Sequence, residues 1–313
     1  MLFHGLDLNL LAVLDALFET RSVTKAAKRL ELSQPATSAA LARLREYFKE
    51  DLFTAMGSID GGKEMVPTAF GVTLIDPVRN ILADIRATIR CAPNFSPERS
   101  TRHIRIVASE HMEMVFVGDV VSRAATIAPH MTFEIVNSIS AEFIRTSMKR
   151  AEIDFVVAPI MHICEDQPKT FLFRETAVFL AAKENSRIGE WITLEQLANF
   201  AFVDVVQLKG SKMDPGEQRL VAQVQPPDPQ IRISSFHSFP LYIVGSDRLC
   251  LIGDMMAGQL ARRWPLKVAR FRSGALSFDF FLQWNSSSEQ DPAQKWFREL
   301  AIEAAQTIPA GKQ

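Results

Sequence analysis

The sequence predicts an α/β protein with an N-terminal winged helix-turn-helix, a long connecting helix and a two-lobed α/β domain. Two observations predict this arrangement. Apolar residues recur at helical spacing as far as about residue 90, with short turn signals between the runs. Beyond residue 102, short apolar strands alternate with helical stretches, which is typical of βαβ units. We expect the winged helix-turn-helix at 1–67, the connecting helix at 68–90, a hinge at 91–101 and the α/β domain at 102–313.

Three helices are predicted to form the first domain. Leucines at helical spacing predict a helix from Asp7, which caps it, to about Thr20. A short helix follows over 24–30, where small alanines allow another helix to approach closely. Ser33 is a good N-cap for the third helix, and Pro35 fits its first turn, where the missing N–H costs nothing. This helix is expected to continue to about Phe48.

Charge is unevenly distributed along the chain. The 313 residues carry a net charge of −1. Between Arg21 and Lys49, however, seven basic residues outnumber two acidic ones, which leaves an excess of five positive charges. A local cationic surface of this kind favours a polyanionic partner.

The third helix has the residue types of a helix that reads base pairs. Small side chains let a backbone enter a major groove about 12 Å wide, where glutamine and arginine can make bidentate bonds to adenine and guanine. The residues expected to read base edges are Gln34, Pro35, Ser38 and Arg43. Residues expected along the phosphate backbone are Ser33, Thr37, Arg45, Lys49, Lys25, Lys28 and Arg29. The alternative is a small helical bundle whose basic residues only keep its surface hydrated.

A wing and a long helix are predicted after the third helix. The polar segment "TAMGSIDGGKEMVPT", with "DGG" as a turn signal, predicts a two-stranded wing. A helix from Thr68 to about Arg90 then carries an apolar stripe that is expected to pair with a second copy of the chain. The stripe consists of Leu74, Val78, Ile81, Leu82, Ile85 and Ile89.

The stretch from "DLNLLAVLDALFETRSVTKAAKRLELSQPATSAALARLREYFKEDLF" to "VPTAFG" resembles the N-terminal domain of LysR-type transcriptional regulators, in their nodulation-regulator and aromatic-responsive branch. The resemblance implies that Gln34, Pro35 and Ser38 enter the major groove. It also implies that Ser33, Thr37 and Arg45 approach the DNA backbone. The sequence departs from the family pattern at Ala39, where relatives often carry arginine. The wing is also longer than usual and carries Lys63 where relatives tend to carry arginine, and we expect Lys63 to contact DNA as well.

The remaining two thirds are predicted to form two linked α/β lobes. "CAPNFSPERSTR" is rich in proline, serine and charge and indicates a hinge. Strands are expected at "HIRIVA", "TFEIV" and "DFVVAP", with helices between them, and then near "AFVDVV", "QIRIS", "RLCLIG" and "LKVARF". The resemblance implies that this domain binds an effector and is similar to a type 2 periplasmic binding protein.

Candidate ligand contacts lie at the ends of these strands, where α/β sheets bind small molecules. Ser109 begins a helix, whose exposed N–H groups favour an anionic or phenolic oxygen. Met112, Phe116 and Phe239 are expected nearby as apolar lining. Each histidine has an alternative interpretation as an ordinary surface or core hydrogen-bonding group. The candidate effector contacts are Ser109, Glu110, His111, Ile160, Met161, Gln207, Phe236 and His237.

The sequence contains no GxGxxG, GxSxG, P-loop or HExxH motif, so we predict that the protein is not an enzyme and has no cofactor, metal or catalytic residues. "MHICED" could imitate a metal site, but it is a single loop cluster. A thiol-based redox sensor pairing Cys164 with Cys250 is a second possibility, and a small-molecule-binding enzyme is a third.

The three cysteines lie far apart in no CxxC pattern, so neither disulfides nor a zinc site is indicated. The start of the chain lacks the features of a secretion signal, and no apolar run approaches the roughly 20 residues of a membrane span. We therefore expect a cytoplasmic protein. The resemblance implies a tetramer on an interrupted palindromic promoter site, a small phenolic or chlorinated aromatic effector, and contact with RNA polymerase.

Overall fold

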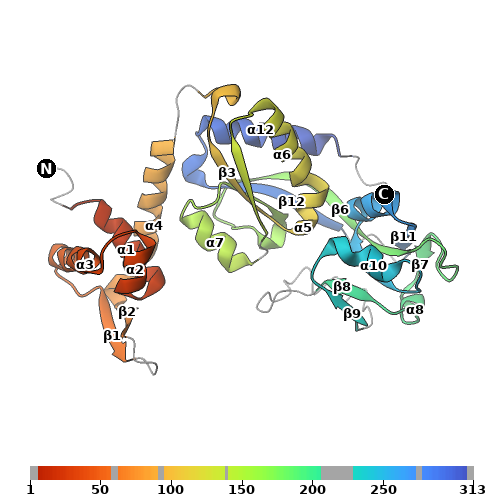
Figure 1. The fold of residues 1–313 in the computed structure, drawn as a ribbon, viewed down its shortest axis with the longest axis horizontal. Helices are drawn as coiled ribbons and strands as arrows, with labels where there is room; N and C mark the ends of the chain where they lie inside the picture. The colour runs from red at the N-terminus through yellow and green to blue at the C-terminus, as the bar shows by residue number, and fades with distance from the viewer. Residues whose placement is uncertain are drawn as a thin grey trace. The chain divides into compact units, whose positions relative to one another are not determined.

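The computed structural model describes residues 6–57, 63–90, 95–137, 140–205, 228–272 and 277–308. The chain forms two compact units (Figure 1). The first unit contains residues 1–90 with Lys149–Ala151, and the second contains residues 91–148 and 152–313. Each unit has its own hydrophobic core.

The first unit begins with three helices, α1 (Asn9–Thr20), α2 (Val23–Arg29) and α3 (Gln34–Phe48). A polar side chain supports the start of each one. The Asn9 amide donates to Asp7 Oδ1 (2.9 Å), Ser22 caps α2, and Ser33 caps α3 by accepting from the Ala36 amide (3.2 Å). The predicted helix starts are therefore confirmed to within two residues.

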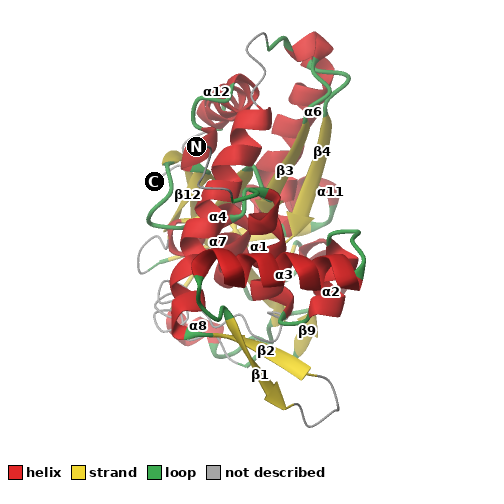
Figure 2. Ribbon diagram, turned by 90° about the vertical axis from the view of Figure 1, so that its left-hand side faces the viewer, coloured by secondary structure: helices red, strands yellow, loops and turns green. Residues whose placement is uncertain are grey.

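A two-stranded wing and a long helix complete this unit. Strands β1 (Phe53–Gly57) and β2 (Lys63–Pro67) pair antiparallel, as predicted, and Figure 2 shows them extending away from α1, α2 and α3. Helix α4 (Ala69–Arg90) packs on α1 through Val78 and Leu82, which are buried. Arg79 of α4 also makes an ion pair with buried Asp15 of α1 at 3.2 Å.

The second unit begins with the predicted βαβαβ arrangement. Strand β3 pairs in parallel with both β4 and β5. Strand β12 is antiparallel to β5 on one side and to the N-terminal half of β6 (Lys169–Ala182) on the other. We call this part the first lobe. Its elements are η2 (Pro97–Arg99), β3 (His103–Ala108), α5 (Glu110–Met112), the π-helical η3 (Glu113–Val117), α6 (Gly118–Ile127), β4 (Thr132–Asn137), α7 (Ala141–Lys149), β5 (Phe155–Pro159), η4 (Ile160–His162), β12 (Ser277–Trp284), η6 (Ser286–Ser288) and α12 (Pro292–Gln306).

The long strand β6 (Lys169–Ala182) continues into a second lobe, where its C-terminal half pairs antiparallel with β10 and β11. Strand β7 joins β11 in parallel, and β8 and β9 form a separate parallel pair. The elements of the second lobe are β7 (Trp191–Ile192), α8 (Leu194–Leu197), β8 (Val203–Val205), β9 (Ile231–Ile233), η5 (Phe236–Ser238), α10 (Phe239–Ile243), β10 (Leu249–Gly253), α11 (Asp254–Arg263) and β11 (Leu266–Phe271).

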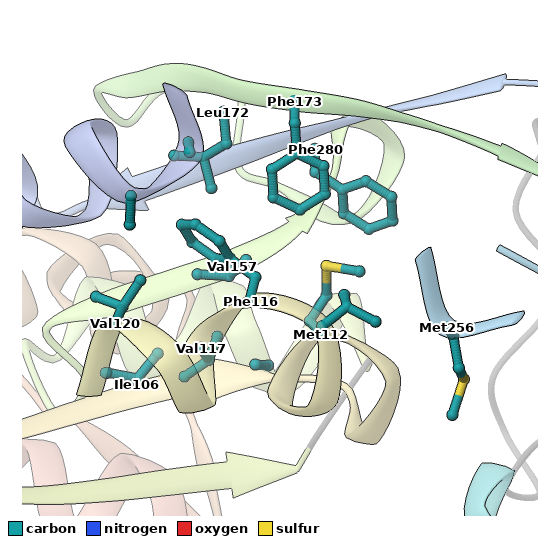
Figure 3. Packing of buried hydrophobic residues seen from close by; sticks show 14 of the residues in the cluster. Ile106, Met112, Phe116, Val117, Val120, Val157, Leu172, Phe173, Met256 and Phe280 are labelled. Carbon is teal, nitrogen blue, oxygen red and sulfur yellow. The ribbon is translucent and has the colours of Figure 1, made fainter. Parts of the chain in front are cut away.

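One continuous core joins the two lobes. Figure 3 shows Met112 and Phe116 pointing from the helical segment after β3 toward Phe173 and Phe280 on the facing strands. Phe116 and Phe173 have ring centroids 5.2 Å apart. Met112, Phe116 and Phe239 are all buried, so the expectation that they line a ligand site is wrong.

Candidate nucleic-acid interface and ligand site

Helix α3 presents a face of small side chains to solvent. Ser33, Gln34, Pro35, Ser38 and Arg43 are all exposed, as a helix that enters a groove requires. Leu41 and Leu44 on the opposite side are buried in the core. The exposed alanines add no bulk, so the backbone of the helix remains open to close approach. These alanines are Ala36, Ala39 and Ala42.

Thr37 lies on the other side of the helix. Its side chain is 0% exposed, and its hydroxyl donates to the Ser33 carbonyl at 3.1 Å. It therefore cannot reach a phosphate, and the prediction that Thr37 contacts the DNA backbone is wrong. Four residues after the N-cap Ser33, the Thr37 side chain turns back onto the first turn of its own helix.

The basic residues around α3 form two groups. Arg43 lies 3.6 Å from the Asp7 carboxylate, and Arg45 lies 3.5 Å from that of Asp51. These pairs place the guanidinium groups beside α3, and at such exposure each pair contributes only about 0–1 kcal/mol. Lys25, Lys28 and Lys49 are exposed around the helix ends. Lys63 begins strand β2 of the wing, and its side chain lies outside the described residues.

In the second unit, Glu110 connects the two lobes. Its carboxylate accepts hydrogen bonds from Ser235 Oγ (2.5 Å), from the Phe236 amide (3.1 Å) and from His237 Nδ1 (2.5 Å). Burial alone would raise the pKa of Glu110, but the hydrogen bonds from Ser235, His237 and the Phe236 amide lower it below its ordinary value. Glu110 is thus an ionised acceptor in the first lobe that holds a turn of the second.

His111 makes a second connection. Its Nε2 lies 2.7 Å from the buried Glu175 carboxylate of β6, which also accepts from the Met255 amide at 3.2 Å. The neighbouring Asp254 accepts from the Thr176 amide at 3.2 Å. Burial, together with the Glu175 charge, raises the pKa of Asp254 even though that amide donates to it. We call Glu110, His111, Glu175, Ser235, Phe236, His237 and Asp254 the inter-lobe cluster.

Aromatic rings lie beside this cluster. The His111 ring stacks parallel to Phe280 with centroids 6.5 Å apart, and it meets the edge of Phe236 at 5.7 Å. Four of the predicted ligand contacts, Glu110, His111, Phe236 and His237, are therefore brought together.

The other four predicted ligand contacts are not shown in this cluster. Ser109 Oγ accepts from the Met112 amide (3.2 Å), so it serves as the N-cap of its helix. Ile160 is exposed in the turn after β5. Gln207 and the side chain of Met161 lie outside the described residues.

Two family models match the chain. The model described as "Bacterial regulatory helix-turn-helix protein, lysR family" matches residues 8–72, and "LysR substrate binding domain" matches residues 97–306. The chain belongs to the LysR family. As a LysR-type transcriptional regulator it is a DNA-binding protein and not an enzyme.

Relatives of this LysR-type regulator span its whole length. Nodulation protein D 1 of Bradyrhizobium diazoefficiens is 32% identical over 313 residues, covering 100% of this chain and 98% of the relative. A full-length OxyR from Pseudomonas aeruginosa is 14% identical with a TM-score of 0.68, covering 99% of both chains. CbnR, solved with its target DNA, is 15% identical with a TM-score of 0.51, covering 96% of this chain and 100% of that one. The solved structures establish a shared fold.

Sequence reasoning missed three members of the inter-lobe cluster of this LysR-type regulator. Glu175 lies within the apolar run "LFRETAVFLAA", where an acid needs a buried partner. Asp254 follows Gly253 at the junction of a strand and a helix, and Ser235 precedes the predicted Phe236. The available signal was an acid inside a long apolar run.

Neither alternative site is supported by the described part of the LysR-type regulator. Cys250 is fully buried, and burial raises the pKa of its thiol well above the ordinary value, whereas a redox sensor needs an accessible thiolate. No group of three His, Cys, Asp or Glu side chains among the described residues could hold a metal ion. Within the same residues, no helix has the length and apolar character needed to cross a bilayer.

Proposed function

We propose that this LysR-type regulator inserts α3 into the major groove of an interrupted palindromic promoter site and activates transcription in response to a small aromatic effector. The exposed face of small residues on α3 is the observation that carries the DNA-reading part. Gln34 and Arg43 read base edges, and Pro35 and Ser38 allow close approach. Ser33 and Arg45 position the helix on the phosphates, and Lys63 extends the contact through the wing.

A dimer presents two copies of α3 to the two halves of a palindrome. Helix α4 supports the proposal that it pairs two chains, because Ile81 is 44% exposed and Ile89 is 79% exposed. Together with Asp84, Ile85 and Thr88 they line a shallow groove on the helix. Two such dimers form the tetramer that family likeness implies, and ligand-dependent rearrangement changes DNA bending and contact with RNA polymerase in the cytoplasm.

The inter-lobe cluster supports an effector site at the carboxyl end of β3. His111 and Phe236 supply ring surfaces, which suit a flat aromatic ligand such as a phenol or a chlorinated aromatic. Nodulation protein D 1 aligns with this chain over nearly its whole length, and the alignment includes this domain. We expect phenolic probes to raise the melting temperature of the full chain, with a stabilisation that grows as the logarithm of one plus the ratio of probe concentration to Kd, whereas aliphatic acids leave it unchanged.

The DNA-reading part is tested with the protein's own upstream DNA and with scrambled DNA of equal length. Gln34→Ala or Arg43→Ala should each weaken binding to the upstream DNA by about 1–3 kcal/mol, or about 5- to 150-fold. Gln34→Ala should leave binding to scrambled DNA nearly unchanged, whereas Arg43→Ala, which also removes a positive charge, should weaken it less than it weakens binding to the upstream DNA. Arg123→Ala is a matched control, because Arg123 is a partly exposed arginine of α6 paired with Asp119 at 2.7 Å. Unaltered upstream binding in both α3 variants would show that another element reads the DNA.

A further inference from the structure

The inter-lobe cluster has two arms that start from consecutive residues. Glu110 and His111 stand at the first turn of the helical segment that follows β3. The first arm is the carboxylate of Glu110, which accepts from Ser235, Phe236 and His237 at the start of η5 and α10. The second arm is the imidazole of His111, which reaches Glu175 and through it the N-terminal turn of α11.

The first arm is a strong contact by its chemistry. Three donors converge on one ionised carboxylate, and hydrogen bonds to charged groups are about twice as strong as those between neutral groups. Since Ser235, Phe236 and His237 belong to one turn, losing Glu110 would release all three from the first lobe together.

The second arm depends on close approach between β6 and α11. A Cβ at Gly253 would lie 2.1 Å from the carboxyl carbon of Glu175, so only glycine lets that carboxylate reach the helix end. Met255 donates its amide to Glu175, and Thr176 donates its amide to Asp254, so strand and helix are joined in both directions. His111 attaches the first lobe to this junction.

We propose that Glu110 and His111 are positioning residues that hold α10 and α11 of the second lobe independently, one arm each. This inference rests on the proposed function, in which an effector acts through the second unit. A ligand that contacts the helix start at Glu110 and His111 then changes both arms at once, and the two helices transmit its presence to the second lobe.

Amide hydrogen exchange on the full chain, without DNA, tests the two arms separately. Glu110→Ala should speed exchange over residues 236–243 by about tenfold and leave residues 254–263 unchanged. His111→Ala should give the reverse pattern. Glu113→Ala is the matched control, because Glu113 is an exposed acid three residues further along the same helical segment. We expect it to change neither region.

A conservative pair of variants covers the case in which an alanine variant fails to fold. His111→Gln keeps an N–H donor that can reach Glu175, so it should restore protection of residues 254–263 from exchange. Glu110→Gln turns an amide group toward the donors of the turn, so amide exchange over residues 236–243 should stay fast. A misfolded variant is recognised by faster exchange in the core strand β5 (Phe155–Pro159). Equal acceleration of both regions by every variant, or no acceleration in either, would overturn the proposal while leaving the DNA-binding result untouched.

Discussion

At the residue scale, the effect of a carboxylate depends on whether donors surround it. Glu110 and Asp254 belong to the same cluster, yet the pKa of Glu110 is lowered and that of Asp254 is raised. Both are affected by burial, which favours the neutral acid. Glu110 overcomes burial because three donors converge on it, whereas Asp254 lies beside the charge of Glu175. Neighbouring acids of one site thus differ in the pH range over which they affect stability.

The first prediction follows from the lowered pKa of Glu110. A group whose pKa falls on folding contributes stability above its unfolded pKa, which is about 4.5 for glutamate, and that contribution is lost as pH falls through the folded value. Glu110→Gln should therefore lower the melting temperature at pH 7 by several degrees, since lost hydrogen bonds to a charged group cost about 1.5–3 kcal/mol. The difference from the parent protein should shrink below pH 4.5. A difference that stays constant down to pH 3.5 would contradict this account.

Gly253 gives a second prediction at this scale. Gly253→Ala forces a Cβ against the Glu175 carboxylate and should cost about 1–3 kcal/mol of stability through overpacking. Gly258→Ala, in the helix α11 that Gly253 precedes, is the control, because a Cβ there meets nothing within 4 Å and alanine favours a helix by about 0.5–1 kcal/mol. Thermal unfolding should therefore move in opposite directions for the two variants. A loss of stability in both would point to a general intolerance of α11.

The predictability of individual residues depends on how local their causes are. Ser33 and Pro35 were predictable because capping and the first helical turn involve only neighbouring residues. The burial of Thr37 depends on the rotation of α3 against α1 and α2, so a periodic pattern of small residues did not reveal it. The partners of Glu110 lie more than a hundred residues away, and only the fold brings them together.

At the element scale, helix α4 divides its apolar stripe between two uses. Val78 and Leu82 are buried against α1, whereas Ile81 and Ile89 remain exposed. The sequence predicted a single stripe for a partner chain, because helical spacing alone does not distinguish a face that packs within the unit from one that does not. The exposed isoleucines therefore form the narrower surface on which dimerisation is proposed to depend.

Ile89→Asp tests this surface with little risk to the fold, since the side chain is 79% exposed in the chain itself. Burying an isoleucine contributes about 1.5–3 kcal/mol, and a symmetric dimer contains two copies, so the dissociation constant should rise more than tenfold. Sedimentation equilibrium measures it, and circular dichroism checks that helix content is unchanged. Leu241→Asp, at a 67% exposed leucine of α10, should have no such effect. A normal dimer with Ile89→Asp would place the interface elsewhere.

Strands of the second unit were predictable where they alternate with helices. The first βαβαβ arrangement was predicted and found, and so were the later strands β8, β9, β10 and β11. The long strand β6 was not predicted, although it pairs with both lobes. Two charged residues, Arg174 and Glu175, interrupt its apolar run, and charged residues suggest a loop. Their partners in the fold, Asp279 and His111, are distant in the sequence.

At the scale of the whole molecule, the net charge of −1 conceals an uneven distribution of charge along the chain. The stretch from Arg21 to Lys49 holds five net positive charges, while the remaining chain is acidic overall. A cationic helix-turn-helix binds phosphate without sequence preference, and the acidic remainder limits that attraction to one surface. The lysines contribute affinity and α3 contributes sequence specificity. Measuring DNA binding at several salt concentrations therefore separates the two contributions.

Salt dependence provides the last prediction. For B-DNA the logarithm of the binding constant falls with the logarithm of salt concentration by about 0.9 per neutralised phosphate. Lys25→Gln, Lys28→Gln or Lys49→Gln should each reduce this slope by about 1 for every copy of the residue that contacts a phosphate, hence by about 2 in a dimer. The loss should be equal on the protein's upstream DNA and on scrambled DNA, because phosphates carry no sequence information. Lys183→Gln removes an exposed lysine of the second unit and should leave the slope unchanged. If the α3-flanking lysines behaved like Lys183, the positive charge around α3 would have to be assigned to another partner.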